Sequence, residues 1–344
     1  MQNEIYEDIF NNFEEIEIKE IASSIPDELI VSKPPVLIPK RISDLPGADE
    51  PISFLVDGWI EEKSLNSIIA PSKAGKSILS LQLAASVQNG LEFLHTFKCN
   101  KADVLYVDFE LKPNVIKQRF ESLKSYLGIE LEEPYYLSLA NDYAHGVVDF
   151  YNVIDSVNAA IAKNPNIKLV IFDCFYTWVM GDPNSEIDAR RSLMPLKGLS
   201  EDLAIVYVHH TNKAGIDLGN VGNAGSGSSV HFRIVDSSCV IIPDQKAKET
   251  QKMFELAFMG RNCPDVNIRC KRGDETNHQF VPVSFVPNAS EKFDEISKYI
   301  ADGHIGRGNL AFIRKDFSVT VDELRGIGFD VDTKHSQVTI PDVS

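Results

Sequence analysis

The 344-residue sequence has few cysteines, no long apolar run and too little positive charge, and each shortage excludes a class of protein. Its five cysteines are scattered and form no C-x-x-C pair, which argues against a disulfide framework or a zinc ribbon. Reduced thiols in the cytoplasm fit this pattern best. The most apolar stretch, LVIFDCFYTWVM from Leu169, is shorter than the ~20 residues that span a bilayer and contains Asp173. The acidic start MQNEIYEDIF predicts neither a signal peptide nor a transit peptide.

Of these shortages, the shortage of positive charge is the most informative. The chain has 34 lysines and arginines against 50 aspartates and glutamates, a net charge of −16. A protein that coats duplex DNA is usually basic, so this composition argues against a simple DNA-coating role. It remains compatible with a ring that concentrates a few basic side chains on an inner surface, because the local field matters more than the total charge.

We expect three parts along the chain. Residues 1–50 form an acidic segment followed by a proline-rich linker, residues 51–287 an ordered α/β domain, and residues 288–344 a small C-terminal extension of unknown role. Apolar residues recur at helical spacing within the first 16 positions. This segment is either a solvated tail or a short helix that docks on a neighbouring subunit or another protein.

The middle part alternates apolar strands with helical patterns. Strands are predicted at 65–70, 104–109, 167–173 and 204–210, and helices at 77–89, 113–123 and 186–201. Strands that are apolar throughout and separated by helices indicate a mostly parallel twisted sheet covered on both faces. After a glycine-rich stretch, the runs SCVII, FELAFM and QFVPVSFV predict antiparallel additions. The expected fold class is α/β.

A phosphate-binding loop is predicted between the first strand and the first helix. The stretch APSKAGKS follows the pattern G-x-x-x-x-G-K-[ST] except that alanine replaces the first glycine. A strand leading in and a helix leading out point backbone N–H groups at an anion, whereas an accidental helix cap would need no such setting. Lys76 would reach the terminal phosphates of ATP, and the Ser77 hydroxyl would bind Mg²⁺. The predicted nucleotide-binding loop comprises Ala70, Pro71, Ser72, Lys73, Ala74, Gly75, Lys76, Ser77 and Ile78.

Acidic side chains end two other predicted strands, at the edge where open α/β sheets bind ligands. Asp173 closes LVIFD and suits an acid that faces Mg²⁺, directly or through water. Glu110 follows VLYVDF and could orient the attacking water as general base, with Asp108 as the alternative for that role. Helix capping or a plain surface position is the other interpretation of these acids.

His209 and His210 close the next strand. A polar pair at that position could sense the γ-phosphate and pass the signal into the glycine-rich stretch at 219–229. A structural role for at least one of them is equally compatible with the sequence, since buried histidines often satisfy nearby backbone groups.

The order APSKAGKS, LYVDFE, LVIFD, VYVHHTNKAG and GSGSSV resembles the RecA-like ATPases of the plasmid RepA hexameric helicase type, over about residues 40–265. The resemblance implies ATP and Mg²⁺ at Lys76 and Ser77, Glu110 as catalytic base, Asp173 on the Mg²⁺ side, and His210 or His209 as phosphate sensor. It also implies a hexameric ring with single-stranded DNA in its channel.

The sequence departs from this family at three places. Ala70 replaces glycine, and Ser226 stands where many relatives have an arginine. The stretch FMGRNCPD resembles the K-x-R-N-G-P stretch of replicative helicases without its lysine and glycine. Arg261 is therefore the first candidate for a residue that acts on the neighbouring subunit's γ-phosphate, and Arg233 and Lys213 are the next candidates. Surface salt bridges are the alternative for each.

The loops expected to face DNA are weakly basic. Arg190 and Arg191 follow the strand that ends at Asp173, and they either contact DNA or lie on a solvated helix face. The first hypothesis is an ATP-driven motor on single-stranded DNA in replication of a plasmid, phage or mobile element. The second is an ATP-dependent recombination, repair or loading factor without unwinding. The third is a nucleotide-binding interaction module that does not hydrolyse ATP.

Overall fold

The computed structural model describes residues 39, 41–44, 51–140, 149–175, 185–210, 230–244, 252–284, 289–303, 309–317 and 319–340. The chain divides into two units, Met1–Pro51 and Ile52–Ser344, and in the first the described part contains one short 3-10 helix, Ile42–Asp44. The apolar stripe within residues 1–16 and the glycine-rich stretch lie outside the described residues. Within the described ranges, no helix is both long enough and apolar enough to cross a bilayer. The expected boundary at residue 288 stays a prediction.

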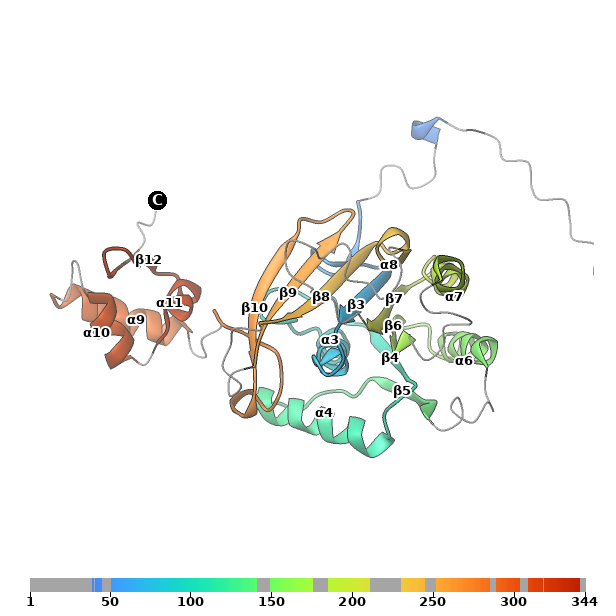
Figure 1. The fold of residues 1–344 in the computed structure, drawn as a ribbon, viewed down its shortest axis with the longest axis horizontal. Coiled ribbons are helices and arrows are strands. Elements are labelled where there is room, and N and C mark those ends of the chain that lie inside the picture. The colour runs from blue at the N-terminus through green and yellow to red at the C-terminus, as the bar shows by residue number, and fades with distance from the viewer. Residues whose placement is uncertain are drawn as a thin grey trace, which may run out of the picture. The chain divides into compact units, whose positions relative to one another are not determined.

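The second unit is built on a nine-stranded sheet with the predicted phosphate-loop strand at its centre (Figure 1). The strand order is β11-β10-β9-β8-β3-β7-β6-β4-β5. Neighbours from β8 through β5 pair in parallel, whereas β9, β10 and β11 are antiparallel additions at one edge. The strands are β3 (Leu65–Ala70), β4 (Asp103–Asp108), β5 (Tyr135–Ser138), β6 (Ile167–Asp173), β7 (Ala204–His210), β8 (Ser237–Pro243), β9 (Lys252–Gly260), β10 (Val266–Arg272) and β11 (Val281–Pro282).

The structure confirms the predicted α/β fold and corrects several of its elements. The run SCVII forms β8, which is parallel to β3, with Cys239 beside Ile68, and not antiparallel as expected. The composition of a strand does not determine its direction, which depends on the connection before it, here residues 211–236. QFVPVSFV contributes only the two residues of β11. The sequence reasoning missed β5, β10 and the helix before β6.

Within the described residues, five helices accompany the sheet, and local signals set their ends. α3 ends at Asn89 and is capped by Gly90, whose φ of 65° is the left-handed conformation that glycine adopts without strain. α4 has a proline in its first turn, and α6 begins with a reciprocal pair of hydrogen bonds between Asp149 and Asn152. The helices are α3 (Lys76–Asn89), α4 (Pro113–Leu127), α6 (Phe150–Lys163), α7 (Glu186–Leu199) and α8 (Val230–Ile234).

Alternation along the strands produces two cores, one on each face of the sheet. On β6, Leu169 and Ile171 pack into the core that contains α3 and α4, whereas Val170 and Phe172 pack into the core with α6 and α7. Figure 1 shows the two pairs of helices flanking the sheet. Strands buried on both faces explain why the sequence reads as continuous apolar runs.

Smaller elements complete this unit. A hairpin of β1 (Phe54–Val56) and β2 (Ile60–Glu61) places Trp59 against Phe93 and Phe258, and a 3-10 turn covers Asp274–Thr276. The C-terminal elements have a hydrophobic cluster of their own, which includes Ile296, Ile313 and Leu324. These elements are α9 (Ala289–Ala301), α10 (Asn309–Asp316), α11 (Val321–Ile327), β12 (Asp330–Asp332) and β13 (Gln337–Thr339).

Candidate nucleotide-binding site

A cavity of about 380 Å³ opens where the central parallel strands end. From the predicted loop it is lined by Ser72, Lys73, Gly75, Lys76, Ser77 and Ile78. Glu110, Asp173 and His210 line it as well, although they come from three other segments of the chain. Ala70, Pro71 and Ala74 complete the loop without lining the cavity. The structure thus brings the predicted phosphate loop, Glu110, Asp173 and His210 to one place.

The loop accepts alanine in place of its first glycine. Ala70 is the last residue of β3, and its φ is not positive, so a Cβ there causes no backbone strain. The positive φ values lie further along, at Lys73 (64°) and Gly75 (103°). A Cβ at position 75 would also collide with the Arg272 guanidinium, which would have to move aside. The departure at Ala70 leaves the loop's shape intact.

Lys76 is held over the cavity by the loop itself. Its Nζ donates to the carbonyl oxygens of Ala70 (3.2 Å) and Pro71 (3.0 Å) and lies 2.9 Å from His210 Nδ1. Burial lowers the pKa of Lys76, and the acidic groups of the cavity oppose that shift. A bound phosphate would offer this amine a stronger acceptor than either carbonyl.

Asp173 and Ser77 form the pair that Mg²⁺ requires. The Ser77 side chain hydrogen-bonds to Asp173, and Tyr106 donates its hydroxyl to Asp173 Oδ2 at 2.7 Å. Burial raises the pKa of Asp173 to about 6, although both hydrogen bonds lower it. A buried carboxylate beside a hydroxyl at a phosphate loop is an oxygen donor set that fits Mg²⁺.

Hydrogen bonding distinguishes Asp108 from Glu110, the two acids considered for the catalytic base. Both carboxylate oxygens of Asp108 are engaged: Oδ1 accepts the backbone N–H groups of Glu110 and Leu111 at 2.9 Å each, and Oδ2 accepts the Tyr136 hydroxyl at 3.0 Å. Asp108 therefore shapes the turn after β4. Glu110, which that turn presents, lines the cavity, and burial raises the pKa of its carboxyl group while nearby Lys76 lowers it.

Strand alternation separates the two histidines. Val206 and Val208 of β7 pack on the α3 side, so His210 falls on that side and meets Lys76. Burial and Lys76 lower the pKa of His210 to about 4, which keeps its ring neutral at pH 7. His209 lies on the other face, fully buried, with its ring stacked on His231 at 3.9 Å between centroids. The cavity thus favours His210 as phosphate sensor and gives His209 a packing role.

Two arginines that sequence reasoning missed also line the cavity. Arg119 comes from α4 and has an Nη1 atom that is buried without a hydrogen-bond partner. Arg272 ends β10 with its guanidinium near the rings of Phe254 and Phe280, 5.1 and 5.2 Å from their centroids. Burial and the charge of Arg119 lower the pKa of Arg272. Two cations that line one cavity favour an anionic occupant.

The arginines predicted to act in trans lie elsewhere. Arg261 follows β9 at the end of the strands opposite the cavity. There it donates to the Arg233 carbonyl (2.6 Å) and lies 3.8 Å from Asp236. Arg233 is 3.1 Å from Glu186. Neither lines the cavity of its own chain, so a role on a neighbouring subunit stays a prediction. Lys213 and Ser226 lie outside the described residues.

Arg190 and Arg191 are exposed on α7. Arg191 lies 3.9 Å from Asp188 one turn earlier, which is the geometry of a solvated helix face. The segments 176–184 and 211–229, expected to face DNA, lie outside the described residues.

Replacement of Asp173 by asparagine should abolish Mg²⁺-dependent nucleotide binding and yet stabilise the fold. The ordinary pKa is 3.8 and the folded value about 6, so this group favours folding below pH 3.8 and loses that contribution as pH rises through 6. At pH 7 the loss is about 3 kcal/mol, at 1.36 kcal/mol per pKa unit. Denaturant unfolding of Asp173→Asn and of the exposed control Asp155→Asn between pH 4 and 8 checks this. Equal profiles for both variants and the wild type would refute it.

The sequence matches the AAA domain family (AAA_25) over residues 32–215, which is more than half of the chain. Among solved structures, it is similar to a KaiC-like protein from the hyperthermophilic archaeon Pyrococcus horikoshii OT3. That match has 11% sequence identity and a TM-score of 0.46, and it covers 67% of this chain and 99% of the other. With its phosphate loop, strand-end acids and cavity, the chain belongs to the AAA domain family and is a P-loop ATPase.

Proposed function

We propose that this ATPase is a motor on single-stranded DNA, a hexameric helicase of the plasmid RepA type that serves replication of a plasmid, phage or other mobile element. The observation that carries the proposal is the contact between Lys76 Nζ and His210 Nδ1 at 2.9 Å. It connects the phosphate site to the end of β7, and the chain continues from there into the segment expected to face DNA. A change at the γ-phosphate would thus reach that segment through one side chain.

The residues of the cavity divide the work of hydrolysis. Lys76 binds the β- and γ-phosphates, and Glu110 holds the attacking water and accepts its proton. Ser77 and Asp173 would hold Mg²⁺, which would supply positive charge at the phosphate oxygens. His210 is neutral at pH 7, so it can report on phosphate occupancy through its hydrogen bond with Lys76 without adding charge.

Arginines add the remaining positive charge. Arg119 and Arg272 line the cavity of their own chain and could neutralise an anion there without a neighbouring subunit. Arg261 lies at the strand ends opposite the cavity and could act only from one subunit onto the next. This division supports a ring in which each site has two arginines of its own and one from its neighbour.

A specific observation favours a second candidate, an ATP-dependent recombination, repair or loading factor that does not unwind DNA. In the described part of α7, one of the two arginines expected near DNA is within ion-pair distance of Asp188, and both belong to a solvated helix face. Serine at position 226, in place of the family's arginine, points the same way. A chain with few DNA-facing cations could assemble on DNA but would bind a single strand too weakly to separate it from its complement.

A forked duplex distinguishes these functions. The motor proposal predicts ATP turnover stimulated by single-stranded DNA, strand displacement that requires ATP and Mg²⁺, and a native mass of six chains with nucleotide. Stimulated turnover without displacement would refute the motor and support the loading factor. Absence of turnover above background would refute both and leave a nucleotide-binding interaction module. Lys76→Ala is the control for each assay, because its amine lies at the centre of the site.

A further inference from the structure

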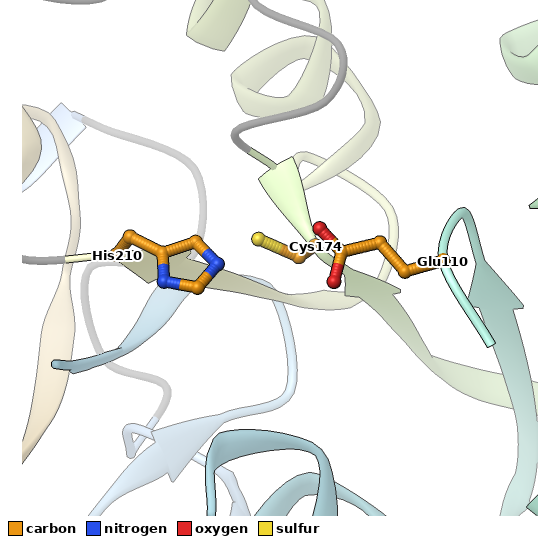
Figure 2. Close-up of side chains that lie close together, drawn as sticks. All are labelled: Glu110, Cys174 and His210. Atoms are coloured by element: carbon orange, nitrogen blue, oxygen red, sulfur yellow. The ribbon is translucent and has the colours of Figure 1, made fainter. Parts of the chain in front are cut away.

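Three donor groups of different chemistry converge beside the phosphate loop. A Glu110 carboxylate oxygen, the Cys174 sulfur and a His210 ring nitrogen all lie within 4.8 Å of one another. Figure 2 shows the three side chains approaching one point from separate strand ends, with a His210 ring nitrogen and the Glu110 carboxylate turned toward the sulfur. Among the described residues, this is the one such group of three or more potential ligands.

Lys76 and Cys174 lie at different nitrogens of the His210 ring. Lys76 Nζ lies against Nδ1, at 2.9 Å, so the nitrogen that faces Cys174 is Nε2 (Figure 2). The amine also donates to two loop carbonyls, which keep it on the far side of the ring. A metal at Nε2 would require the ring proton on Nδ1, so Lys76 would give up this contact and keep its two carbonyl acceptors.

Cys174 lies at the cavity because of its position at the end of β6. It follows Asp173 directly, is 1% exposed, and yet lines the cavity. Its thiol hydrogen-bonds to Glu110, so sulfur and carboxylate already share one proton position. A divalent metal would take the place of that proton, which the thiol releases as the sulfur binds.

We propose that Glu110, Cys174 and His210 form a binding site for a thiophilic divalent cation, Zn²⁺ by its chemistry, in the nucleotide-free protein. One thiolate, one imidazole and one carboxylate are typical zinc ligands, whereas Mg²⁺ prefers oxygen alone. With zinc bonds of about 2.0–2.3 Å, tetrahedral ligands lie roughly 3.3–3.8 Å apart. Closing the present arrangement needs side-chain shifts of about 1 Å, and water completes the fourth position.

The charges around the site fit this occupant. Thiolate and carboxylate together balance the two charges of the cation, and Asp173 adds a further negative charge beside Cys174. Lys76 opposes binding, and so do Lys73, Arg119 and Arg272, which line the same cavity. The opposing cations should make the site one of moderate affinity that empties when nucleotide enters.

Zinc at this site would inhibit ATP hydrolysis, and this part of the inference rests on the proposed function. The cation would occupy Glu110, which holds the attacking water, and His210, which senses phosphate. Turnover should therefore fall as Zn²⁺ is added at constant Mg²⁺-ATP and recover on addition of a chelator. Mg²⁺ in excess should not relieve the inhibition, because it does not compete for sulfur.

Cobalt titration tests the site without any assay of activity. Co²⁺ added to the chelator-treated, nucleotide-free full chain should give a near-ultraviolet sulfur-to-cobalt charge-transfer band that saturates at one equivalent and disappears on addition of Zn²⁺. Loss of an outer-shell partner weakens metal sites by about 10- to 100-fold, so Cys174→Ser should weaken binding by at least about 100-fold and remove the band. His210→Gln and Glu110→Gln should each weaken it.

Cys263→Ser is the matched control, because this half-buried thiol lies on the β9–β10 turn, at the sheet edge away from the cavity. It should leave the band unchanged, and thermal melts verify that each variant is folded. A band that survives Cys174→Ser, or no band in the wild type, overturns the metal site whatever the ATPase result. A band without measurable ATP turnover supports the site and refutes the proposed function instead.

Discussion

Lys76→Ala is expected to reduce ATP turnover by at least about 10²- to 10³-fold, the effect of removing one preorganised donor from a transition state. The amine contacts both the phosphate loop and His210, through hydrogen bonds of 2.9–3.2 Å. Its loss removes the charge that binds the terminal phosphates and breaks the connection to β7. Single-turnover and steady-state ATPase measurements would show the loss.

The fold should survive this substitution. Lys76 is 6% exposed, and burial lowers its pKa, so the ammonium is not stabilised by its surroundings as it would be in water. The melting temperature of Lys76→Ala should therefore be no lower than that of the wild type. Lys101→Ala is the matched control, because Lys101 is exposed, pairs with Glu132 at 2.8 Å and precedes β4 at the edge away from the cavity. If Lys76→Ala turned over ATP at the rate of Lys101→Ala, the assigned site would be wrong.

Glu110→Gln should separate binding from hydrolysis. An amide keeps the shape of the side chain but cannot accept the proton of the attacking water, so turnover should fall by about 10²- to 10⁴-fold, the usual contribution of a general base. Affinity for Mg²⁺-ATP should change little, because Lys76 and Ser77 remain. Equilibrium binding of a fluorescent ATP analogue, measured beside turnover, gives both quantities.

Asp108→Asn is the control for that variant. An asparagine oxygen can still accept the two N–H groups that Asp108 Oδ1 now holds, so the turn after β4 should persist and turnover should fall far less. In the wild type, activity should drop as pH falls through the raised pKa of Glu110, since the base must be ionised. A larger loss in Asp108→Asn than in Glu110→Gln would transfer the base role to Asp108.

The sequence was sufficient to place the phosphate loop and the strand-end acids, because local patterns determine them. A strand, a glycine-lysine-serine and a helix are consecutive in the chain, and acids at the ends of parallel strands must meet at one edge. The alternation of residues between the two faces of a strand contained a further signal, which the prediction did not use. Asp173 and His210 each continue the set of strand positions that packs under α3, so counting in steps of two would have chosen His210 over His209.

Other parts of the site could not be predicted from one sequence. Arg272 ends a strand that was missed, and it reaches Gly75 only because β8, β9 and β10 extend the sheet beyond β3. Arg119 lies on a helix whose face toward the cavity depends on packing against the sheet. Cys174 is an ordinary apolar residue by sequence, and its proximity to Glu110 and His210 requires three strand ends to converge. Such contacts are set by tertiary packing and have no local pattern.

The central claim is that Lys76, Ser77, Asp173 and Glu110 converge on one triphosphate. A crystal structure with Mg²⁺ and a non-hydrolysable ATP analogue tests it most directly. We predict that Lys76 Nζ leaves the carbonyl oxygens of the loop for the terminal phosphates, with the Mg²⁺ ion beside Ser77 and Asp173 and the γ-phosphate within reach of a water on Glu110. A triphosphate bound elsewhere, or Lys76 still bonded to both carbonyls beside it, would contradict this account.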